Sequence, residues 1–343
     1  MVSFRLILLA LIAGTILVGC TEPADQRVVN VYTARHYASD EAIYAEFTRE
    51  TGIHVNTVSA SGDLLIERVR ADGDRSPADI IITVDSARLY RAQDAGLFAA
   101  SDFDAITQSV PARYVEPNGH WVATSARARG IAFSRDRVAA DELSSYEDLA
   151  DPKWAGRLCM RSSDNVYNQS LLASLVAHLG PEAAEDWARG VVANFARPPS
   201  GGDTDQLRAI AAGECDASLV NHYYFARLAN SEAEADQNIV DAVDMYFPGA
   251  EFGGVHVNVS GVGIAAAAPH PEEAMALIEF LLSNYAQRAF AEMTNEFPVT
   301  GLDDYDNDNV RRFINLPQDD LDFITLGEQT ATAQRIFDRA GWP

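Results

Sequence analysis

The strongest constraint on the fold is an alternation of strand-like and helix-like segments in the first third of the chain. Residues 28–34 and 53–60 alternate apolar and polar side chains, whereas residues 78–85, ADIIITVD, form a continuous apolar run. Such a run is typical of a strand buried on both faces of a parallel sheet. The order strand–helix–strand therefore predicts a parallel sheet covered by helices. The expected helices in this region are 39–52, 62–72 and 86–98.

The helix boundaries carry recognisable signals. Ser39 or Asp40 is the expected N-cap of the first helix, and Gly52 is its expected stop. Gly180 ends one later helix, and Pro181 begins the next, because proline suits the first helical position. Ser145, with Asp148 three residues later, predicts another cap. Further expected helices are 166–180, 181–195, 204–214, 271–293 and 324–341.

Two extended stretches, 121–134 and 255–268, interrupt this pattern and predict two crossings between lobes. We therefore expect an α/β protein with two lobes, each a mixed sheet flanked by helices, and a ligand cleft between them. Ligands in open α/β sheets bind beyond the carboxyl ends of the strands. The expected organisation is a signal peptide at 1–19, a lipidated tether at 20–27, lobe 1 at 28–122 with 256–300, and lobe 2 at 123–255 with 301–343.

The N-terminus predicts export. Arg5 precedes an apolar run over 6–18 that is too short for a comfortable membrane span. The ending Leu-Val-Gly-Cys at 17–20 is similar to a bacterial lipobox, which implies cleavage before Cys20 and lipid attachment to its sulfur. A plain signal peptide that happens to have a cysteine nearby is the alternative. The expected location is the periplasm, with a lipid anchor as the only membrane contact.

The charge excludes some partners. The chain has 26 basic and 50 acidic residues among 343, a formal net charge of -24. A nucleic-acid backbone requires lysine and arginine, so nucleic acid is an improbable partner, as are anionic lipid headgroups. A strongly acidic protein attracts cations in general. Solubility alone is the competing explanation for the acidity.

Cysteine usage leaves two readings open. With Cys20 lipidated, Cys159 and Cys215 remain, and an even pair in an oxidising compartment favours a disulfide. Two unrelated buried thiols are the alternative. No CxxC or HExxH motif occurs, so the sequence supports neither a thiolate zinc site nor a zinc protease.

Tyrosines cluster where strands are expected to end. His36 and Tyr37 follow the first strand, Tyr167 stands at the entry to a helix, and Tyr223 and Tyr224 follow the strand expected at 215–221. Neighbours in a strand point to opposite faces, whereas neighbours in the first turn of a helix differ by about 100° and can converge. Packing of half-buried rings is the simpler explanation for each tyrosine taken singly.

Converging phenols fit a hard, trivalent cation. A phenol has a pKa near 10, so several phenolates at neutral pH require a strong Lewis acid to displace their protons. Fe³⁺ is the abundant ion that prefers such oxygen donors and accepts imidazole. Four phenolates against Fe³⁺ leave a charge of about -1, which nearby arginines can offset. The candidates are Arg35, Arg127, Arg129 and Arg227, each of which could equally form a surface ion pair.

The remaining histidines do not add a metal-binding pattern. His222, beside the tyrosine pair, is expected to be a hydrogen-bonding neighbour and not a ligand. No ligand spacing is visible for His54, His120, His178, His256 and His270.

Several stretches resemble the periplasmic ferric-iron-binding proteins of ABC importers, the iron-binding class within the type II solute-binding fold. They are NVYTARHY, SPADIIITVD, ADPKWAGR, RSSDNVYNQSL, NHYY and HVNVSGVGIA, which occur in family order over nearly all of the mature chain. The resemblance implies Fe³⁺ ligation by Tyr37, Tyr167, Tyr223 and Tyr224, with His36 as a fifth ligand in some members. It also implies a disulfide between Cys159 and Cys215 in the second lobe, delivery of iron to an ABC permease, a monomer, and no obligatory synergistic anion.

Other functions remain as alternatives. A receptor for another small solute, a polyamine or an organic anion, is one alternative. A polyamine site would need acidic residues and stacking rings around the cleft, for which Asp85, Asp164 and Trp121 are the candidates. An extracytoplasmic enzyme lacks support, because no GxSxG elbow, P-loop or GxGxxG motif occurs. A structural lipoprotein would not account for the phenols.

Overall fold

The computed structural model describes residues 27–343, apart from residues 36, 250 and 252. The predicted signal peptide, the lipidation site Cys20 and the candidate ligand His36 lie outside the described residues. No helix in the described part of the chain is both long enough and apolar enough to cross a membrane.

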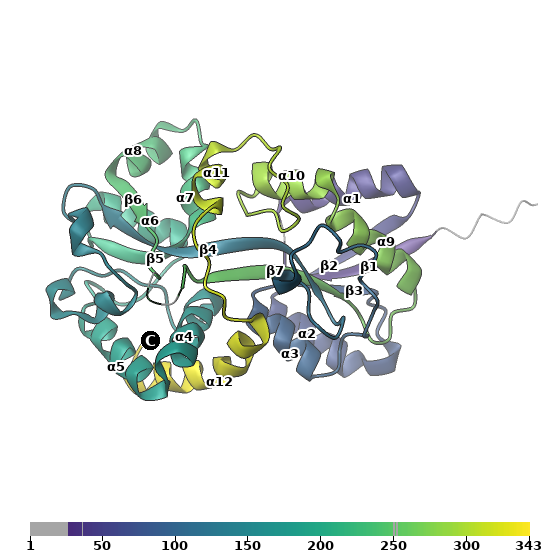
Figure 1. Ribbon diagram of the computed structural model, residues 1–343, viewed down its shortest axis with the longest axis horizontal. Coiled ribbons are helices and arrows are strands. Elements are labelled where there is room, and N and C mark those ends of the chain that lie inside the picture. Colours follow the sequence, from purple (N-terminus) through teal and green to yellow (C-terminus); the bar gives the residue numbers. More distant parts are fainter. Residues whose placement is uncertain (1–26, 36, 250, 252) are drawn as a thin grey trace, which may run out of the picture.

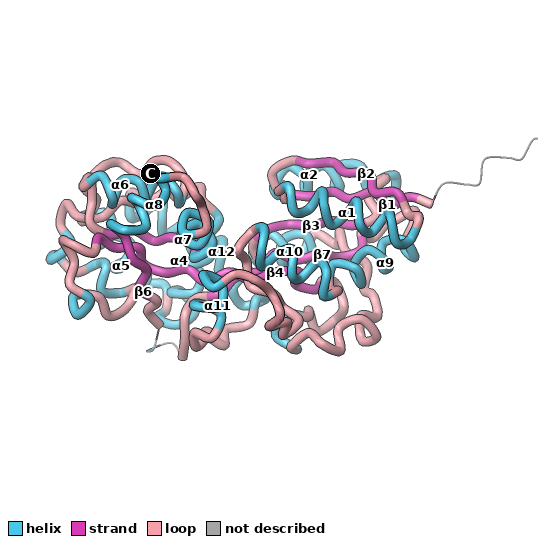
Figure 2. Tube along the Cα trace, turned by 90° about the horizontal axis from the view of Figure 1, so that it is seen from above, coloured by secondary structure: helices cyan, strands magenta, loops and turns pink. Residues whose placement is uncertain are grey.

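Two long strands join the two halves of the molecule (Figure 1). They are β4 (Val122–Ser134) and β7 (Val257–Ile264), which pair with each other in antiparallel register. The sheet is continuous through both halves in the order β2-β1-β3-β7-β4-β5, with β6 also paired to β4. Seen from above, the same two strands run through the narrow middle of the molecule (Figure 2). The extended stretches 121–134 and 255–268 are therefore the expected crossings.

Lobe 1 is built on β1, β2, β3, β7 and the first half of β4. Strand β1 pairs in parallel with β2 and with β3, and β7 runs antiparallel to β3. Residues Ile80–Ile82 of β3 are at most 2% exposed, as the continuous apolar run predicts. The strands are β1 (Val28–Thr33), β2 (His54–Ser59) and β3 (Ile80–Val84). The helices are α1 (Ala38–Thr51), α2 (Gly62–Asp72), α3 (Ser86–Asp94), α9 (Pro271–Leu281) and α10 (Asn284–Met293).

Lobe 2 is built on the second half of β4, which pairs antiparallel with β5 (Ala217–Asn221) and with β6 (Val243–Tyr246). A parallel bridge between Leu158 and Ala217 extends this sheet, so it is mixed as well. The helices are α4 (Val166–Leu179), α5 (Pro181–Ala193), α6 (Asp203–Ala212), α7 (His222–Ala229), α8 (Glu234–Ala242) and α11 (Asp308–Ile314). Short 3₁₀ helices span Gly73–Arg75, Ala112–Tyr114, Ala140–Glu142, Glu147–Ala150 and Pro152–Trp154.

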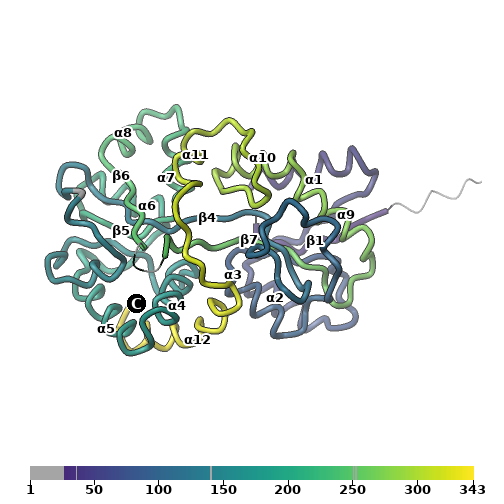
Figure 3. Tube along the Cα trace, viewed as in Figure 1, coloured from purple at the N-terminus to yellow at the C-terminus, as the bar shows by residue number. Residues whose placement is uncertain are grey.

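The C-terminal helix α12 (Phe323–Ala340) lies along both lobes, and the tube of Figure 3 shows the chain reaching it from α11. It packs on α3 of lobe 1 and on α4 and α5 of lobe 2. At its start, the Phe323 ring stacks on Tyr114 of lobe 1 with 6.2 Å between centroids. Just beyond its end, Trp342 packs against Trp187 of lobe 2 at 6.1 Å.

Two expectations about helix ends are wrong. The N-cap of α1 is Tyr37 and not Ser39 or Asp40; the Asp40 carboxylate instead accepts a hydrogen bond from the Tyr37 backbone N–H. The expected helix 271–293 is two helices, because Ser283 starts a new one by accepting a hydrogen bond from the Ala286 N–H. Gly52 does end α1, in the left-handed conformation that glycine adopts at no steric cost.

A disulfide joins Cys159 to Cys215 in lobe 2, with Cα atoms 5.7 Å apart. The bond ties the segment that precedes β5 to the start of the loop that leads to α4. This confirms the pairing that the family resemblance implies.

Candidate functional site

Tyr37 enters the site from lobe 1. Strand β1 ends at Thr33, and the Thr33 hydroxyl accepts a hydrogen bond from the Arg35 N–H, which starts the turn. The turn delivers Tyr37 to the N-cap of α1, where its φ and ψ are extended. The Arg35 guanidinium lies 5.1 Å from the centre of the Tyr37 ring.

Tyr167 and the pair Tyr223–Tyr224 enter from lobe 2. Asn165 caps α4 by accepting a hydrogen bond from the Asn168 N–H, so Tyr167 lies in the first turn. Strand β5 ends at Asn221 and α7 begins at His222, so the pair also lies in a first helical turn. This confirms that the pair follows strand 215–221 in a geometry that allows its rings to converge.

The structure brings the four phenols together across the two lobes. The Tyr223 hydroxyl donates a 3.2 Å hydrogen bond to the Tyr167 hydroxyl. Tyr37 lies close enough to Tyr223 and Tyr167 for these phenols to affect the pKa of one another. The rings of Tyr223 and Tyr224 lie 4.2 Å apart at an angle of 30°. Tyr223, which is 4% exposed, is thus the centre of the cluster. All four residues stand at helix N-termini, whose partial positive charge favours a phenolate.

Guanidinium groups surround the phenols. Around the Tyr167 ring, Arg127, Arg129 and Arg161 lie 5.4, 5.9 and 5.7 Å from its centre. Arg127 is buried, and its Nε and Nη2 have no hydrogen-bond partner within the described residues. On the outer side, Arg227 is exposed and lies 5.1 Å from the Tyr224 ring. The candidate arginines therefore all lie beside a predicted ligand, and Arg161, which has no sequence signal, joins them.

Burial keeps Tyr37, Tyr223 and Tyr224 protonated when no cation is present. Burial, followed by the charges of Glu296 and Tyr167, raises the pKa of Tyr37 to about 12, although Arg35 acts in the opposite direction. Burial and the neighbouring phenols also raise the pKa of Tyr223 well above its ordinary value. For Tyr224, burial, Tyr167 and Asp203 raise the pKa. Because each phenolate opposes ionisation of the others, only a cation of high charge could ionise the set.

A pocket of about 300 Å³ opens beside Tyr167 and Tyr224. Arg88 lines it from lobe 1, and Arg161 and Ser162 line it from lobe 2. It therefore lies at the boundary between the lobes and gives the phenols access to solvent. A larger cavity of about 570 Å³ lies within lobe 1 between residues 101 and 119, and none of the four tyrosines lines it.

The His222 side chain links α7 to the backbone of two other segments. Its Nδ1 accepts a 3.1 Å hydrogen bond from the Ala128 N–H of β4, and its Nε2 donates a 3.0 Å bond to the Asn295 carbonyl. Both ring nitrogens are thus used, in agreement with the prediction that His222 is a hydrogen-bonding neighbour. Burial lowers its pKa to about 3. Within the described residues, His, Cys, Asp and Glu side chains form no group of three that could hold a metal ion.

The residues proposed for a polyamine site do not gather in the cleft. Asp85 is fully buried and caps α3, where it accepts hydrogen bonds from Ala87 N–H and from the Ser170 hydroxyl of lobe 2. Trp121 is 2% exposed and donates its indole N–H to Gln93 inside lobe 1. Only the exposed Asp164 lines the pocket beside the phenols.

Sequence reasoning missed two residues near the phenols. Glu296 forms a 2.9 Å ion pair with Arg35, and Asn295 binds His222 through its backbone carbonyl. Both lie in the connection after α10, more than 70 residues from the nearest predicted ligand in the chain. No spacing or motif marks them, so only the tertiary structure reveals them.

The sequence matches one family of binding proteins and several iron-binding relatives. The family described as bacterial extracellular solute-binding protein matches residues 75–322. The chain is 44% identical to Iron uptake protein A1 of Synechocystis sp. over 320 residues, which cover 93% of this chain and 89% of that protein. It is 28% identical to the Major ferric iron-binding protein of Neisseria meningitidis, over 84% of this chain and 85% of that protein.

Solved structures match over the same extent. A Trichodesmium protein, described as IdiA or FutA in complex with iron and citrate ligands, superposes with a TM-score of 0.86 at 43% identity. The match covers 92% of this chain and all of that one. Apo FutA2 from Synechocystis also superposes with a TM-score of 0.86, at 42% identity over 93% of this chain and all of that one.

Proposed function

The chain belongs to the family of bacterial extracellular solute-binding proteins, and we propose that it is a receptor for ferric iron. In this proposal Tyr37, Tyr167, Tyr223 and Tyr224 bind Fe³⁺ as phenolates in the cleft between the lobes. His36 is a fifth candidate ligand, since it precedes Tyr37 in the chain.

One observation carries the proposal, namely the convergence of four phenols from two lobes on one place. Tyr167 is hydrogen-bonded to Tyr223, Tyr224 packs its ring against Tyr223, and Tyr37 approaches from lobe 1 closely enough to shift the pKa of Tyr223. Packing alone would not require phenol hydroxyl groups from both lobes to meet at one place, because a buried hydroxyl costs solvation free energy unless it finds a hydrogen-bond partner. The names of the relatives, which include an iron uptake protein and ferric iron-binding proteins, support the same ligand.

The chemistry of capture follows from the donors. When Fe³⁺ binds, it supplies the charge that displaces the phenol protons. The helix N-termini and the surrounding guanidinium groups then stabilise the excess negative charge of the phenolates. Closure of the lobes around the ligand is the usual motion of two-lobe receptors. In this structure Tyr37 of lobe 1 already lies beside the three phenols of lobe 2.

The proposal extends to transport. We infer that the chain binds iron without transforming it and passes it to the permease of an ABC importer. Attachment to the membrane through a lipid on Cys20 is part of the proposal. A tyrosine in lobe 1 supports binding without an obligatory anion, although Arg161 beside the pocket offers a place where an anion could bind.

A visible-absorption titration tests the function. The soluble form that begins after Cys20 is stripped of metal, and ferric nitrilotriacetate is added with and without citrate. We expect a phenolate-to-iron charge-transfer band that saturates at one iron per chain and that does not depend on citrate. The band should fade in Tyr224→Phe, which removes one donor with little change in shape.

Tyr114→Phe is the matched control. Tyr114 is a buried tyrosine that donates a hydrogen bond to Gln318, away from the four phenols. This variant should lose some stability and keep the whole band. A folded wild-type protein that develops no band would overturn the proposal. Growth of the band only in the presence of citrate would contradict the independence from an anion.

A further inference from the structure

Four residues that follow α10 contact the neighbours of Tyr37 in lobe 1 and of the pair Tyr223–Tyr224 in lobe 2. The segment Thr294–Phe297 is buried, and Asn295 has a φ of 61°, a conformation that asparagine tolerates better than most residues. Phe297 exchanges two backbone hydrogen bonds with Ala126 of β4, at 2.8 and 2.9 Å. The segment is thereby attached to one of the two strands that join the lobes.

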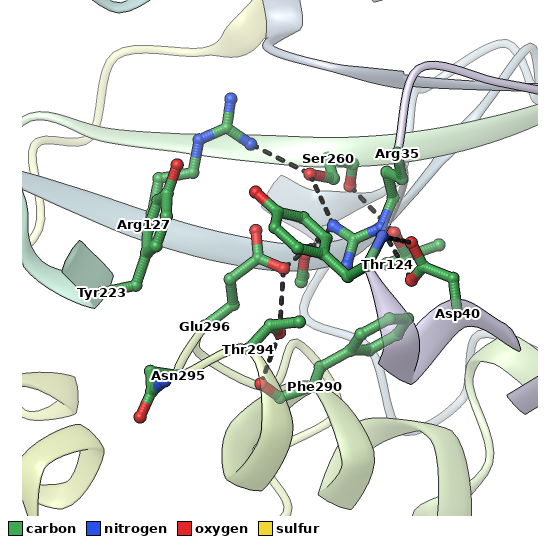
Figure 4. Close-up of polar contacts among 12 residues, drawn as sticks. Arg35, Asp40, Thr124, Arg127, Tyr223, Ser260, Phe290, Thr294, Asn295 and Glu296 are labelled. Carbon is green, nitrogen blue, oxygen red and sulfur yellow. Dashed lines mark hydrogen bonds and ion pairs between the residues drawn. The ribbon is translucent and has the colours of Figure 1, made fainter. Parts of the chain in front are cut away.

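Glu296 connects this segment to Tyr37. Its Oε2 accepts a 2.9 Å hydrogen bond from Arg35 Nη1 and a 3.2 Å bond from the Thr294 hydroxyl. Figure 4 shows the Arg35 guanidinium held between Glu296 and Asp40. Asp40 in turn accepts the bond from the Tyr37 N–H. Arg35 therefore has little freedom to move, and its flat face sets the position of the Tyr37 ring.

Asn295 connects the same segment to Tyr223 and Tyr224. Its carbonyl accepts the bond from His222 Nε2, and His222 immediately precedes the pair. The His222 ring also stacks on Phe297, with 3.9 Å between centroids and 17° between planes. The Asn295 side chain accepts two further bonds, from Asn230 at the end of α7 and from Asn307. Both ends of the helix that carries the tyrosine pair are thus attached to this segment.

We propose that the segment Thr294–Phe297 couples the two halves of the site, with Glu296 and His222 as positioning residues that fix the distance between Tyr37 and the pair Tyr223–Tyr224. The proposal rests on the proposed ferric-iron function. Neither residue touches the ion, and each acts through a tyrosine. When the lobes close, this segment, called the coupler below, would hold the four donors at the spacing that the ion requires.

The direction in which Glu296→Ala changes iron affinity distinguishes a positioning role of Glu296 from an effect of its charge. Loading the site with Fe³⁺ and removing four phenol protons changes its charge by about -1, so a nearby negative charge opposes binding. If Glu296 acted only through its charge, Glu296→Gln and Glu296→Ala would both tighten iron binding. If Glu296 positions Arg35, Glu296→Ala weakens binding, and Glu296→Gln keeps it, because the amide oxygen still accepts the bond from Arg35.

The experiment measures competition between the protein and nitrilotriacetate for Fe³⁺, together with the charge-transfer spectrum. We expect Glu296→Ala to weaken binding by about tenfold or more, as is usual for a residue that orients a metal ligand. The charge-transfer band of Glu296→Ala should move toward the band of Tyr37→Phe. When Glu296→Ala is added to Tyr37→Phe, iron affinity should not fall further. His222→Phe, which keeps the stack on Phe297 and removes both hydrogen bonds, should also weaken binding.

A double-mutant cycle tests the coupling itself. Because Glu296 and His222 act through one segment, the double variant should lose less affinity than the sum of the single losses. Additive losses would show two independent contacts and overturn the coupler. Equal tightening by Glu296→Gln and Glu296→Ala would overturn the positioning role.

The control is Glu116→Gln, a change at a buried carboxylate of lobe 1 that is hydrogen-bonded to Asn118 and has no contact with the tyrosines. It should leave affinity and spectrum unchanged. Circular dichroism of each iron-free variant verifies that it folds. If the wild-type protein develops no charge-transfer band, the ferric-iron function is refuted. If the wild-type band is normal and every Glu296 variant keeps the same band and affinity, only the coupler is refuted.

Discussion

The two lobes contribute unequally to the candidate site. Lobe 2 supplies three phenols on the first turns of two helices, and these three are already in mutual contact. Lobe 1 supplies Tyr37 alone, from a turn held by the ion pairs of Arg35 with Asp40 and Glu296. Under the proposed function, this difference predicts a division of roles in which lobe 2 offers the first binding surface and lobe 1 completes the coordination and retains the ion.

The strongest test of this comparison removes the lobe 2 donors. We expect the variant with Tyr167, Tyr223 and Tyr224 all changed to Phe to lose more than about a thousandfold in Fe³⁺ affinity, because one phenolate cannot offset a trivalent ion. Equilibrium competition with nitrilotriacetate measures the loss. Retention of affinity within tenfold of the wild type would mean that lobe 2 is not the main binding surface.

The second test concerns the stability of the two lobes. The disulfide joins residues 56 apart within lobe 2, so the double variant Cys159→Ala/Cys215→Ala should lose about 2–4 kcal/mol of unfolding free energy. Urea denaturation measures this loss. Hydrogen exchange should increase in β5 and α6 and remain unchanged in β1 and β2. An equal increase in both lobes would show that they unfold as one unit.

The third test removes the lobe 1 donor. Tyr37→Phe should weaken binding by about tenfold to a hundredfold, or roughly 1.4–2.8 kcal/mol, because three phenolates remain. The loss should lie mainly in a faster release of iron to a chelator, measured by stopped-flow absorbance. A change confined to the association rate would contradict the role of lobe 1 in retaining the ion.

The smallest expected effect is on the pH dependence of iron affinity. The pKa of Tyr37 is about 12, so its phenol is protonated near neutral pH and must release a proton to bind iron. Iron affinity therefore falls as the pH falls, and the slope of log affinity against pH counts the protons released. Tyr37→Phe should reduce this slope by about one. An unchanged slope would mean that Tyr37 does not bind as a phenolate.

Much of the architecture follows from local patterns. The apolar run of β3, the strand at β2 and the stop at Gly52 are properties of a few neighbouring residues, and all are found in the structure. The errors lie where local signals compete. Ser39 and Asp40 are good capping residues, but the turn that positions Tyr37 shifts the start of α1. Similarly, residues 271–293 are helix-forming throughout, yet Ser283 caps a second helix.

The sequence by itself determined the chemical inventory of this protein: tyrosines after strand ends, a pair of cysteines, and two extended crossings between helix-rich lobes. These features depend on residue type and on spacing of a few positions, which a chain displays directly. Only the tertiary structure decided which distant residues support the phenols. Glu296 meets Arg35 across 261 positions of the chain, and His222 meets Asn295 across 73. Such contacts arise because α10 and the segment that follows it pack against β4, and no local pattern records that packing.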